Sequence, residues 1–319
     1  MPPSPGVDCG IFSIGGRYFA VTTDPFPVHL ELGMERAIWL AVHITASDLC
    51  TTGLRPAWAA ISLALPPDFH ENTIGAIWER ASEECAALGC SIVARKVLRA
   101  PRSSQPMSGS ITMLGSGETY VTTRSARPGD VILMTKSAGL EAAIVLALSF
   151  REKVEKAFGS DVFRAIDSRF MEMSTVRDSE VCMSAGTGSE GVTSMHDATE
   201  GGVLGALFEI SEASGNGIEV YGESINVYEE VGQVCSLFGI DPLRSISEGT
   251  LIITARPQAV DGLIDSMRRA GIHVSEIGRI LEKSEGKWMV RSGRRERLVH
   301  PGRDPYWAAF DAARKSGVR

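Results

Sequence analysis

The sequence predicts a mixed α and β fold divided between two domains, and three observations support this prediction. The chain has 319 residues, of which 44% are hydrophobic and 22% charged, as is typical of a globular protein with about two domains. Segments with the two-residue alternation of β-strands are interleaved with segments whose apolar residues recur at helical spacing. The composition changes over residues 123–130, which contain arginine, proline and glycine. We therefore expect domains at 1–125 and 126–319.

The first half opens with a hairpin pattern. Residues 10–24 alternate around a Gly15-Gly16 turn and end on Asp24. The period then changes, and residues 33–53 have helical spacing with a small, polar stripe that contains Asp48. The other elements expected in this half are a buried strand at 57–65, a helix at 71–89, and strands at about 91–98 and 109–115.

The second half predicts alternating strands and helices. We expect a buried strand at 131–135, an alanine-rich helix after residues 136–141, charged helices from about 150 to 186, a strand at 250–255, a helix at 257–270 and closing strands. Residues 186–191 match the G-x-G-x-x-G pattern but follow a helical stretch and precede a strand. A dinucleotide-binding turn needs the order strand, glycines, helix, so we interpret this segment as a flexible loop.

Charge and hydropathy exclude two classes of protein. The formal net charge is −7, and the short basic run at Arg291, Arg294 and Arg295 lies in an expected surface hairpin, so we do not expect nucleic-acid binding. No apolar run reaches the roughly 18 residues that a membrane span needs. Residues 1–5 form neither a charged leader nor an apolar core. The expected location is therefore cytoplasmic, with no membrane partner.

The cysteines and histidines indicate structural roles. The six cysteines are scattered without a Cys-x-x-Cys pair, and we expect them to be buried and reduced. The six histidines do not show the spacing of zinc ligands, so we do not expect zinc.

The most informative stretch of the sequence is 192–215, where a short apolar run leads through Asp197 into a glycine turn and a helix. The first amides of a helix that begins near Gly202 are unpaired donors with partial positive charge, which attract anions. Gly201 and Gly202 would let a ligand approach the backbone, and Asp197 could hold Mg²⁺ on phosphate oxygens. The alternative is an ordinary strand-to-helix loop with Asp197 as an N-cap.

Three more acids stand at the ends or on the small face of expected elements: Asp8, Asp24 and Asp48. Together with Asp197 they would suit two or three Mg²⁺ ions on a nucleoside triphosphate. A cluster of carboxylates without a cation is costly because like charges repel, so convergence of these acids would itself favour a metal. For Asp48 the alternative is a helix packed tightly on a sheet, with the carboxylate capping a neighbour.

The order of these motifs resembles the aminoimidazole ribonucleotide synthetase superfamily over nearly the whole chain. The segments that carry the resemblance are Gly6–Asp8, Thr22–Pro25, His43–Leu49 with Gly53 and Pro56, Arg127–Ile132, and Met195–Gly202. The resemblance implies ATP and Mg²⁺ as cofactors, with Asp8, Asp24, Asp48 and Asp197 as Mg²⁺–phosphate ligands. It also implies that Thr199, Gly201 and Gly202 lie beside the triphosphate.

The resemblance further implies an architecture and a reaction class. The N-terminal domain would pair its strands across a homodimer into a barrel, and the C-terminal domain would be α+β. The reaction would be phosphoryl transfer to a small-molecule substrate. Residues 239–243 and 247–251 are most similar to the hydrogenase-maturation branch, whereas residues 61–67 are also similar to the thiamine-monophosphate kinases. The apolar strand at 57–65 supports the dimer, because an exposed edge of that composition invites aggregation.

The sequence departs from the family pattern in three places. Ala94, Arg95 and Lys96 replace an element that usually lies next to the nucleotide. Only five residues precede Gly6, where relatives have a longer arm over the nucleotide, and the tail lacks the terminal cysteine of the hydrogenase-maturation proteins. Without that cysteine, we do not expect the hydrogenase-maturation function in its standard form.

Alternatives to phosphoryl transfer follow from these departures. The chain could be a non-catalytic relative that binds a nucleotide or a partner protein, or an acidic protein whose loops bind Ca²⁺ structurally. No catalytic residue is assigned. Glu200 and Glu141 are candidates for a general base, and for both the alternative is an ordinary acid favoured by a helix N-terminus.

Overall fold

The computed structural model describes residues 7–26, 32–67, 69–99, 108–188 and 190–317, and its contacts divide the chain into two units. The first unit runs from Asp8 to Tyr120, and the second from Val121 onward. Each unit mixes helices and strands, which confirms the predicted α+β class. The division by contacts lies close to the boundary expected near residue 125, which stays a prediction.

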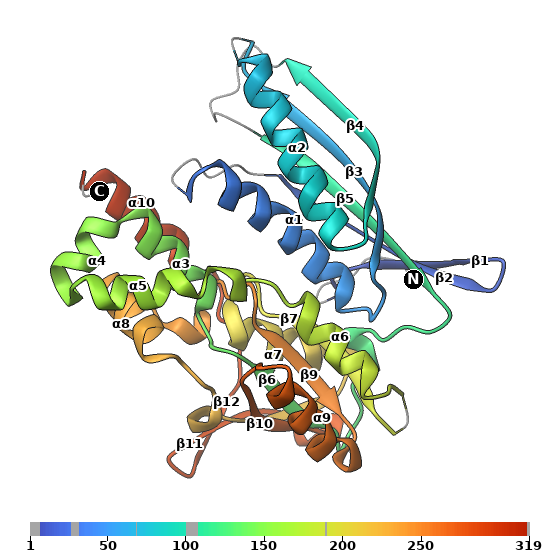
Figure 1. Cartoon of the computed structure of the whole chain (residues 1–319). Coiled ribbons are helices and arrows are strands. Elements are labelled where there is room, and N and C mark those ends of the chain that lie inside the picture. The colour runs from blue at the N-terminus through green and yellow to red at the C-terminus, as the bar shows by residue number, and fades with distance from the viewer. Residues whose placement is uncertain (1–6, 27–31, 68, 100–107, 189, 318–319) are drawn as a thin grey trace. The chain divides into compact units, whose positions relative to one another are not determined.

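The first unit is a five-stranded sheet with the strand order β1-β2-β5-β3-β4. Its strands are β1 (Gly10–Ile14), β2 (Arg17–Pro25), β3 (Pro56–Leu65), β4 (Ser91–Arg99) and β5 (Ser108–Gly117). Its helices are α1 (Met34–Cys50) and α2 (Glu71–Ala87), which lie together along one face of the sheet (Figure 1). Neighbouring strands are antiparallel except β3 and β4, which are parallel because α2 provides the crossover between them.

The hairpin of β1 and β2 forms where the sequence predicts it. Gly15 and Gly16 have φ angles of 58° and 80°, and Ile14 pairs with Arg17 across the turn. A two-residue turn with positive φ at both positions matches the right-handed twist of the strands, and glycine adopts it without strain. The β1 pairing ends at Gly10 opposite Val21, and β2 continues beyond it to Asp24, which pairs with Ile111 of β5.

The strand β3 corrects one expectation. It pairs with β5 on one side and β4 on the other, with Ile61 opposite Ile111 and Arg95, so its edge is not exposed within the unit. Its apolar composition therefore reflects an internal strand and gives no support to a dimer. At the end of the order lies β4, on which Val93 and Leu98 are 63% and 59% exposed.

The second unit contains a seven-stranded sheet with the order β12-β11-β8-β10-β6-β9-β7. Its strands are β6 (Val131–Thr135), β7 (Val192–Asp197), β8 (Gly217–Tyr221), β9 (Leu251–Ala255), β10 (Val274–Leu281), β11 (Lys287–Arg291) and β12 (Arg294–Arg297). Its helices are α3 (Leu140–Ser149), α4 (Arg151–Phe158), α5 (Ser160–Ser168), α6 (Val176–Ser184), α7 (Gly202–Ser214), α8 (Glu229–Leu237), α9 (Pro257–Arg269) and α10 (Pro305–Lys315).

The central strands of this sheet are buried on both faces. Ile132 and Met134 of β6 pack into one apolar cluster with Leu207 of α7, whereas the intervening Leu133 packs into a second cluster with Leu263 of α9. Because successive strand residues point to opposite faces, a continuous apolar run is what a strand covered on both sides requires. Helices therefore cover both faces of β6, with α7 on one face and α9 on the other.

Several further expectations are resolved by the second unit. The charged helical region from 150 to 186 is α4, α5 and α6, separated by short breaks. The basic run lies on β11 and β12, where Arg291, Arg294 and Arg295 are exposed, as predicted. The final helix α10 was not expected from the sequence, although Asp304 caps it by accepting the Tyr306 N–H at 2.8 Å and Pro305 stands at its first position.

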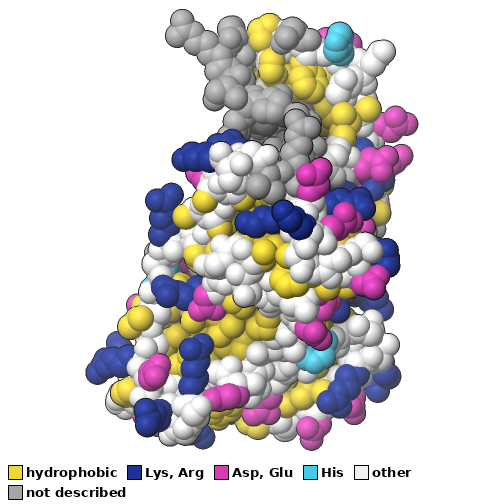
Figure 2. Space-filling view, turned by 90° about the vertical axis from the view of Figure 1, so that its left-hand side faces the viewer, with side chains coloured by type: hydrophobic (Ala, Val, Ile, Leu, Met, Phe, Trp, Pro, Cys, Tyr) yellow, Lys and Arg dark blue, Asp and Glu magenta, His cyan; other side chains and the backbone are white. Residues whose placement is uncertain are grey.

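The surface and the cysteines agree with the composition. All six cysteines are free and buried. Lys and Arg side chains are intermixed with Asp and Glu over the face drawn in Figure 2. Among the helices that the structure describes, none is long and apolar enough to cross a membrane.

Candidate functional site

Three of the four predicted acids converge within the first unit. Asp24 lies near the end of β2 and Asp48 near the end of α1, and their carboxyl groups are linked by a hydrogen bond. Thr22 Oγ1 donates to Asp48 Oδ2 at 3.0 Å, and the thiol of Cys9 donates to the carbonyl oxygen of Asp48 at 3.3 Å. The second contact holds the segment that carries Asp8 against α1. The hairpin, the helix and the N-terminal segment thus bring these carboxylates together.

The electrostatics of Asp24 favour a positive charge beside its carboxyl group. Burial raises the pKa of Asp24, the charge of Asp8 raises it further, and hydrogen bonds from Asp48 and Thr45 lower it. Asp24 Oδ2 is buried and has no hydrogen-bond partner among the described residues. A buried carboxylate oxygen without a donor is costly unless a proton or a cation satisfies it. The donor set of this cluster therefore suits a hard divalent cation such as Mg²⁺.

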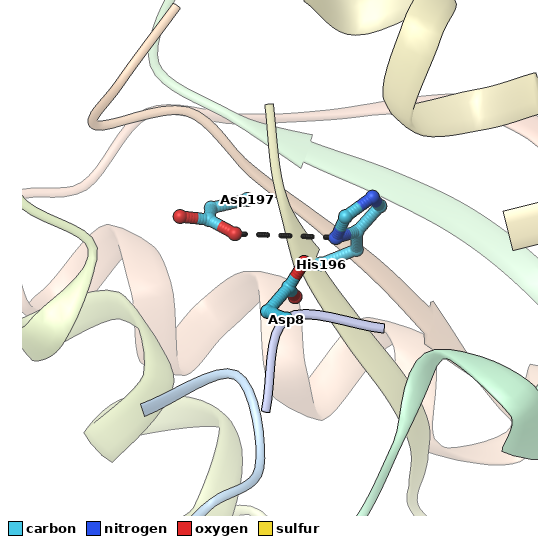
Figure 3. A group of neighbouring side chains, drawn as sticks. All are labelled: Asp8, His196 and Asp197. Atoms are coloured by element: carbon cyan, nitrogen blue, oxygen red, sulfur yellow. Dashed lines mark ion pairs between the residues drawn. The ribbon is translucent and has the colours of Figure 1, made fainter. Parts of the chain in front are cut away.

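The fourth acid, Asp197, ends strand β7 in the second unit, where every residue of the strand is buried. Figure 3 draws Asp197 beside His196, the residue that precedes it on β7. His196 Nδ1 lies 3.9 Å from Asp197 Oδ1, and its Nε2 lies 2.9 Å from Glu209 Oε2 on α7. The ring is thus positioned between two carboxylates. Asp197 itself is 1% exposed.

The glycine turn after Asp197 has a structural explanation of its own. Gly201 and Gly202 have φ angles of 83° and 61°, which glycine adopts readily. A Cβ on Gly202 would lie 2.5 Å from the carbonyl oxygen of Ser245, so close backbone packing requires glycine there. Thr199 is partly buried, and its carbonyl oxygen accepts the Gly202 N–H at 3.0 Å.

An aspartate that the sequence analysis did not single out lies at this helix N-terminus. Asp304 is 2% exposed, and its Oδ2 accepts the Gly201 N–H at 2.8 Å. Burial raises the pKa of Asp304, and the two backbone N–H donors of Gly201 and Tyr306 lower it. The Gly201 N–H, which was expected to lie beside a triphosphate, thus donates its hydrogen bond to the Asp304 carboxylate. The Asp304-Pro305 pair is a sequence pattern that predicts a helix N-cap. The hydrogen bond from the Gly201 N–H could not be predicted, because Gly201 lies about a hundred residues away along the chain.

Glu141 and Glu200 have different surroundings. Glu141 lies in the first turn of α3, and its Oε2 accepts the N–H of Glu248 at 3.2 Å. Burial raises the pKa of Glu141 to about 7, and the charge of Asp304 raises it as well. Glu200 is exposed. A carboxyl group that changes protonation near neutral pH suits a general base, whereas an exposed one needs no special explanation.

A buried ion pair fixes the turn between β6 and α3. Lys136 has a φ of 56°, unusual for a residue other than glycine, and its Nζ lies 2.9 Å from Asp178 Oδ2. The same ammonium donates to the carbonyl oxygens of Ser174 and Gly249 at 2.8 and 2.7 Å. All three N–H donors are used, so this lysine holds the turn and does not offer a charge to a ligand.

The segment that departs from the family pattern lies on β4. Ala94, Arg95 and Lys96 are all exposed, and the guanidinium of Arg95 lies 5.9 Å from the centroid of the Trp78 ring. These cations therefore face solvent along a strand at the end of the sheet order.

The two units and their acids define a class of protein: a two-domain α+β chain with a carboxylate cluster in one unit and a buried aspartate at a strand-to-helix turn in the other. Family models make the class specific. The AIR synthase related protein N-terminal domain matches residues 6–116, and the corresponding C-terminal domain matches residues 127–291. The chain therefore belongs to the AIR synthase related proteins, which confirms the resemblance.

Individual relatives agree with this membership. The carbamoyl dehydratase HypE of Rhizobium leguminosarum bv. viciae is 26% identical over 278 residues, which cover 86% of this chain and 74% of that protein. The structure of AaThiL complexed with AMPPCP and TMP has a TM-score of 0.70 at 22% identity, covering 91% of this chain and 89% of that one. The structure of HypE in complex with ATP has a TM-score of 0.68 at 21% identity, covering 90% and 86%. At these identities the two structures show a shared fold.

Proposed function

We propose that this protein is an ATP- and Mg²⁺-dependent, phosphoryl-transferring enzyme that acts on a small molecule. The observation that carries the proposal is the convergence of Asp8, Asp24 and Asp48, with a buried oxygen of Asp24 that no described donor satisfies. Two carboxyl groups joined by a hydrogen bond must share a proton, and a divalent cation can take the place of that proton. The HypE complex with ATP and the ThiL complex with AMPPCP support a nucleotide as the second component.

In this proposal the acids of the first unit and Asp197 hold Mg²⁺ on the triphosphate. Bound Mg²⁺ would neutralise the charge that develops on the transferred phosphoryl group. The protein's own part is positioning. The hydroxyl of Thr22 orients Asp48, and the buried strand β7 fixes Asp197 at its end. Glu141, with its pKa of about 7, is the candidate for accepting a proton from the acceptor substrate.

The first experiment measures the melting temperature with and without Mg²⁺ and ATP, on the wild type and on Asp48→Asn and Asp197→Asn. A ligand that binds only the folded protein stabilises it by about 2.7 kcal/mol when the free ligand concentration is about 100 times the Kd. Such a stabilisation gives a readily measured rise in the melting temperature. We expect the rise to need Mg²⁺ and to be lost in both variants. Asp161→Asn is the matched control, because Asp161 is exposed on α5.

The unliganded melting temperatures separate a binding defect from a folding defect. Asparagine keeps an acceptor for the Thr22 hydroxyl and an N–H donor for the hydrogen bond to Asp24, so Asp48→Asn alone should not lower the melting temperature. A wild type that does not respond to saturating Mg²⁺ and ATP would contradict the proposal.

A second candidate function is a non-catalytic relative that binds a nucleotide or a partner protein. Two observations favour it: the Gly201 amide is held by Asp304, and the cationic residues 95–96 on β4 face solvent. ATP turnover over a panel of phosphate- and carboxylate-bearing metabolites separates the two. Only an enzyme releases ADP in a substrate-dependent way, and Glu141→Gln should then reduce the release.

The proposed enzyme is also a homodimer, as the family resemblance implies. The exposed side chains of Val93 and Leu98 on β4 are consistent with a surface that a second copy covers. Light scattering on the purified protein measures this directly, and a clean monomer would exclude a barrel shared between two subunits.

A further inference from the structure

A cavity of about 490 Å³ lies in the second unit, at the opposite end of α7 from the glycine turn. The C-terminal half of α7 forms one side, the start of β8 forms the base, and β11, β12 and the residues that follow β12 form the other side. The helix has 13 residues, so its two ends are about 20 Å apart. The cavity therefore shares no residue with the proposed nucleotide acids, and it falls in the size range of small-molecule sites.

Positive charge predominates in the lining. Lys283, Lys287 and Arg297 contribute ammonium and guanidinium groups, against the single carboxylate of Glu212. Lys287 forms an ion pair with Glu212. Lys283 and Arg297 are exposed, and neither has a carboxylate within 4.0 Å in the described part of the chain. Two of the three cations are thus not neutralised by a carboxylate there, although the guanidinium of Arg297 lies 5.6 Å from the centroid of the Trp288 ring.

The apolar part of the lining lies beside these cations. Phe208 of α7 presents its ring to Lys287, whose Nζ is 4.7 Å from the ring centroid. Leu298 and Val299 follow β12, and the Val299 side chain is 65% exposed although it is apolar. Partial burial lowers the pKa of Lys287, because its charge is incompletely solvated. A flat apolar group against Phe208 with an anion beyond it would satisfy both parts of the lining.

We propose that this cavity binds a small organic anion: a carboxylate or phosphate group attached to a flat apolar ring. The anion lies between Lys283 and Arg297, and the ring packs on Phe208. The proposal is independent of the nucleotide site, because none of these residues belongs to it.

Isothermal titration calorimetry with benzoate, phenyl phosphate and inorganic phosphate tests the proposal on the full chain. EDTA is present throughout, so that Mg²⁺-dependent binding at the acidic cluster does not contribute. We expect the wild type to bind benzoate or phenyl phosphate more tightly than inorganic phosphate. The preferred probe of the two identifies the anion as a carboxylate or a phosphate.

Substitutions locate the binding. The double variant Lys283→Met with Arg297→Gln should weaken binding of the preferred ring-bearing probe by about tenfold or more, as expected for loss of charge-assisted hydrogen bonds. Phe208→Leu should weaken the ring-bearing probes and leave inorganic phosphate unchanged. Arg294→Gln, an exposed charge on the same hairpin that does not line the cavity, is the matched control and should have no effect.

Two results would overturn the proposal. One is no binding of either ring-bearing probe by the wild type at concentrations up to about 10 mM. The other is binding that the double variant retains at full strength, because the probe would then lie elsewhere. Lys283, Arg294 and Arg297 are exposed and Phe208 is half-buried, and an unchanged melting temperature verifies that each variant is folded.

Discussion

Replacing Glu141 with glutamine should make the protein more stable at neutral and alkaline pH. Burial raises the pKa of Glu141 from 4.5 to about 7. In the unfolded chain the group loses its proton near pH 4.5, whereas in the folded protein it keeps the proton up to about pH 7. The unfolded state therefore binds fewer protons between these values, and the stability of the wild type falls as pH rises through this window.

The magnitude follows from the two pKa values. A shift from 4.5 to about 7 corresponds to about 3 kcal/mol of lost stability once the pH is above 7, since one pKa unit is about 1.4 kcal/mol. Glutamine is neutral at every pH, and its carbonyl oxygen can still accept the Glu248 N–H that Glu141 accepts. The variant should therefore match the wild type near pH 4.5 and gain up to about 3 kcal/mol relative to it at pH 8.

Urea unfolding at several pH values between 4.5 and 8, with EDTA present, measures this difference. Glu152→Gln on α4 is the control, because Glu152 is exposed and also lies in the first turn of a helix. A stability difference between Glu141→Gln and the wild type that stays constant across this pH range would refute the reasoning. Burial would then not control the protonation of this carboxyl group.

Two further predictions concern backbone packing and buried charge. Gly202→Ala should lower the free energy of unfolding, measured in urea, by more than about 2 kcal/mol, because the added Cβ would lie 2.5 Å from a carbonyl oxygen. Gly215 has a similar positive φ but open space around its Cα, so Gly215→Ala should cost about 1 kcal/mol in the same assay. Asp178→Asn should cost about 3–5 kcal/mol in the same assay, because it leaves the buried ammonium of Lys136 without its carboxylate. Asp161→Asn breaks an exposed ion pair and should change stability by less than about 1 kcal/mol. Equal effects within either pair would contradict the corresponding argument.

Local patterns were sufficient for most elements of the fold. The alternation around Gly15 and Gly16 predicts the β1–β2 hairpin, and the helical period of residues 33–53 predicts α1, because side-chain periodicity is a property of neighbouring residues. The acids at the ends of these elements could be read in the same way. The family resemblance placed them in a two-domain frame, which the family models confirm.

The tertiary structure alone decided which groups meet. Asp304 occupies the Gly201 amide and Glu248 donates to Glu141, and both pairs join residues about a hundred positions apart. Sheet order likewise placed the buried strand β3 between β5 and β4, so its apolar composition does not support a dimer. The physical reason is that chain periodicity specifies the faces of an element, whereas its partners depend on how all elements pack into one core. The sequence by itself thus determined the elements and the family, and long-range packing determined the surroundings of each carboxylate.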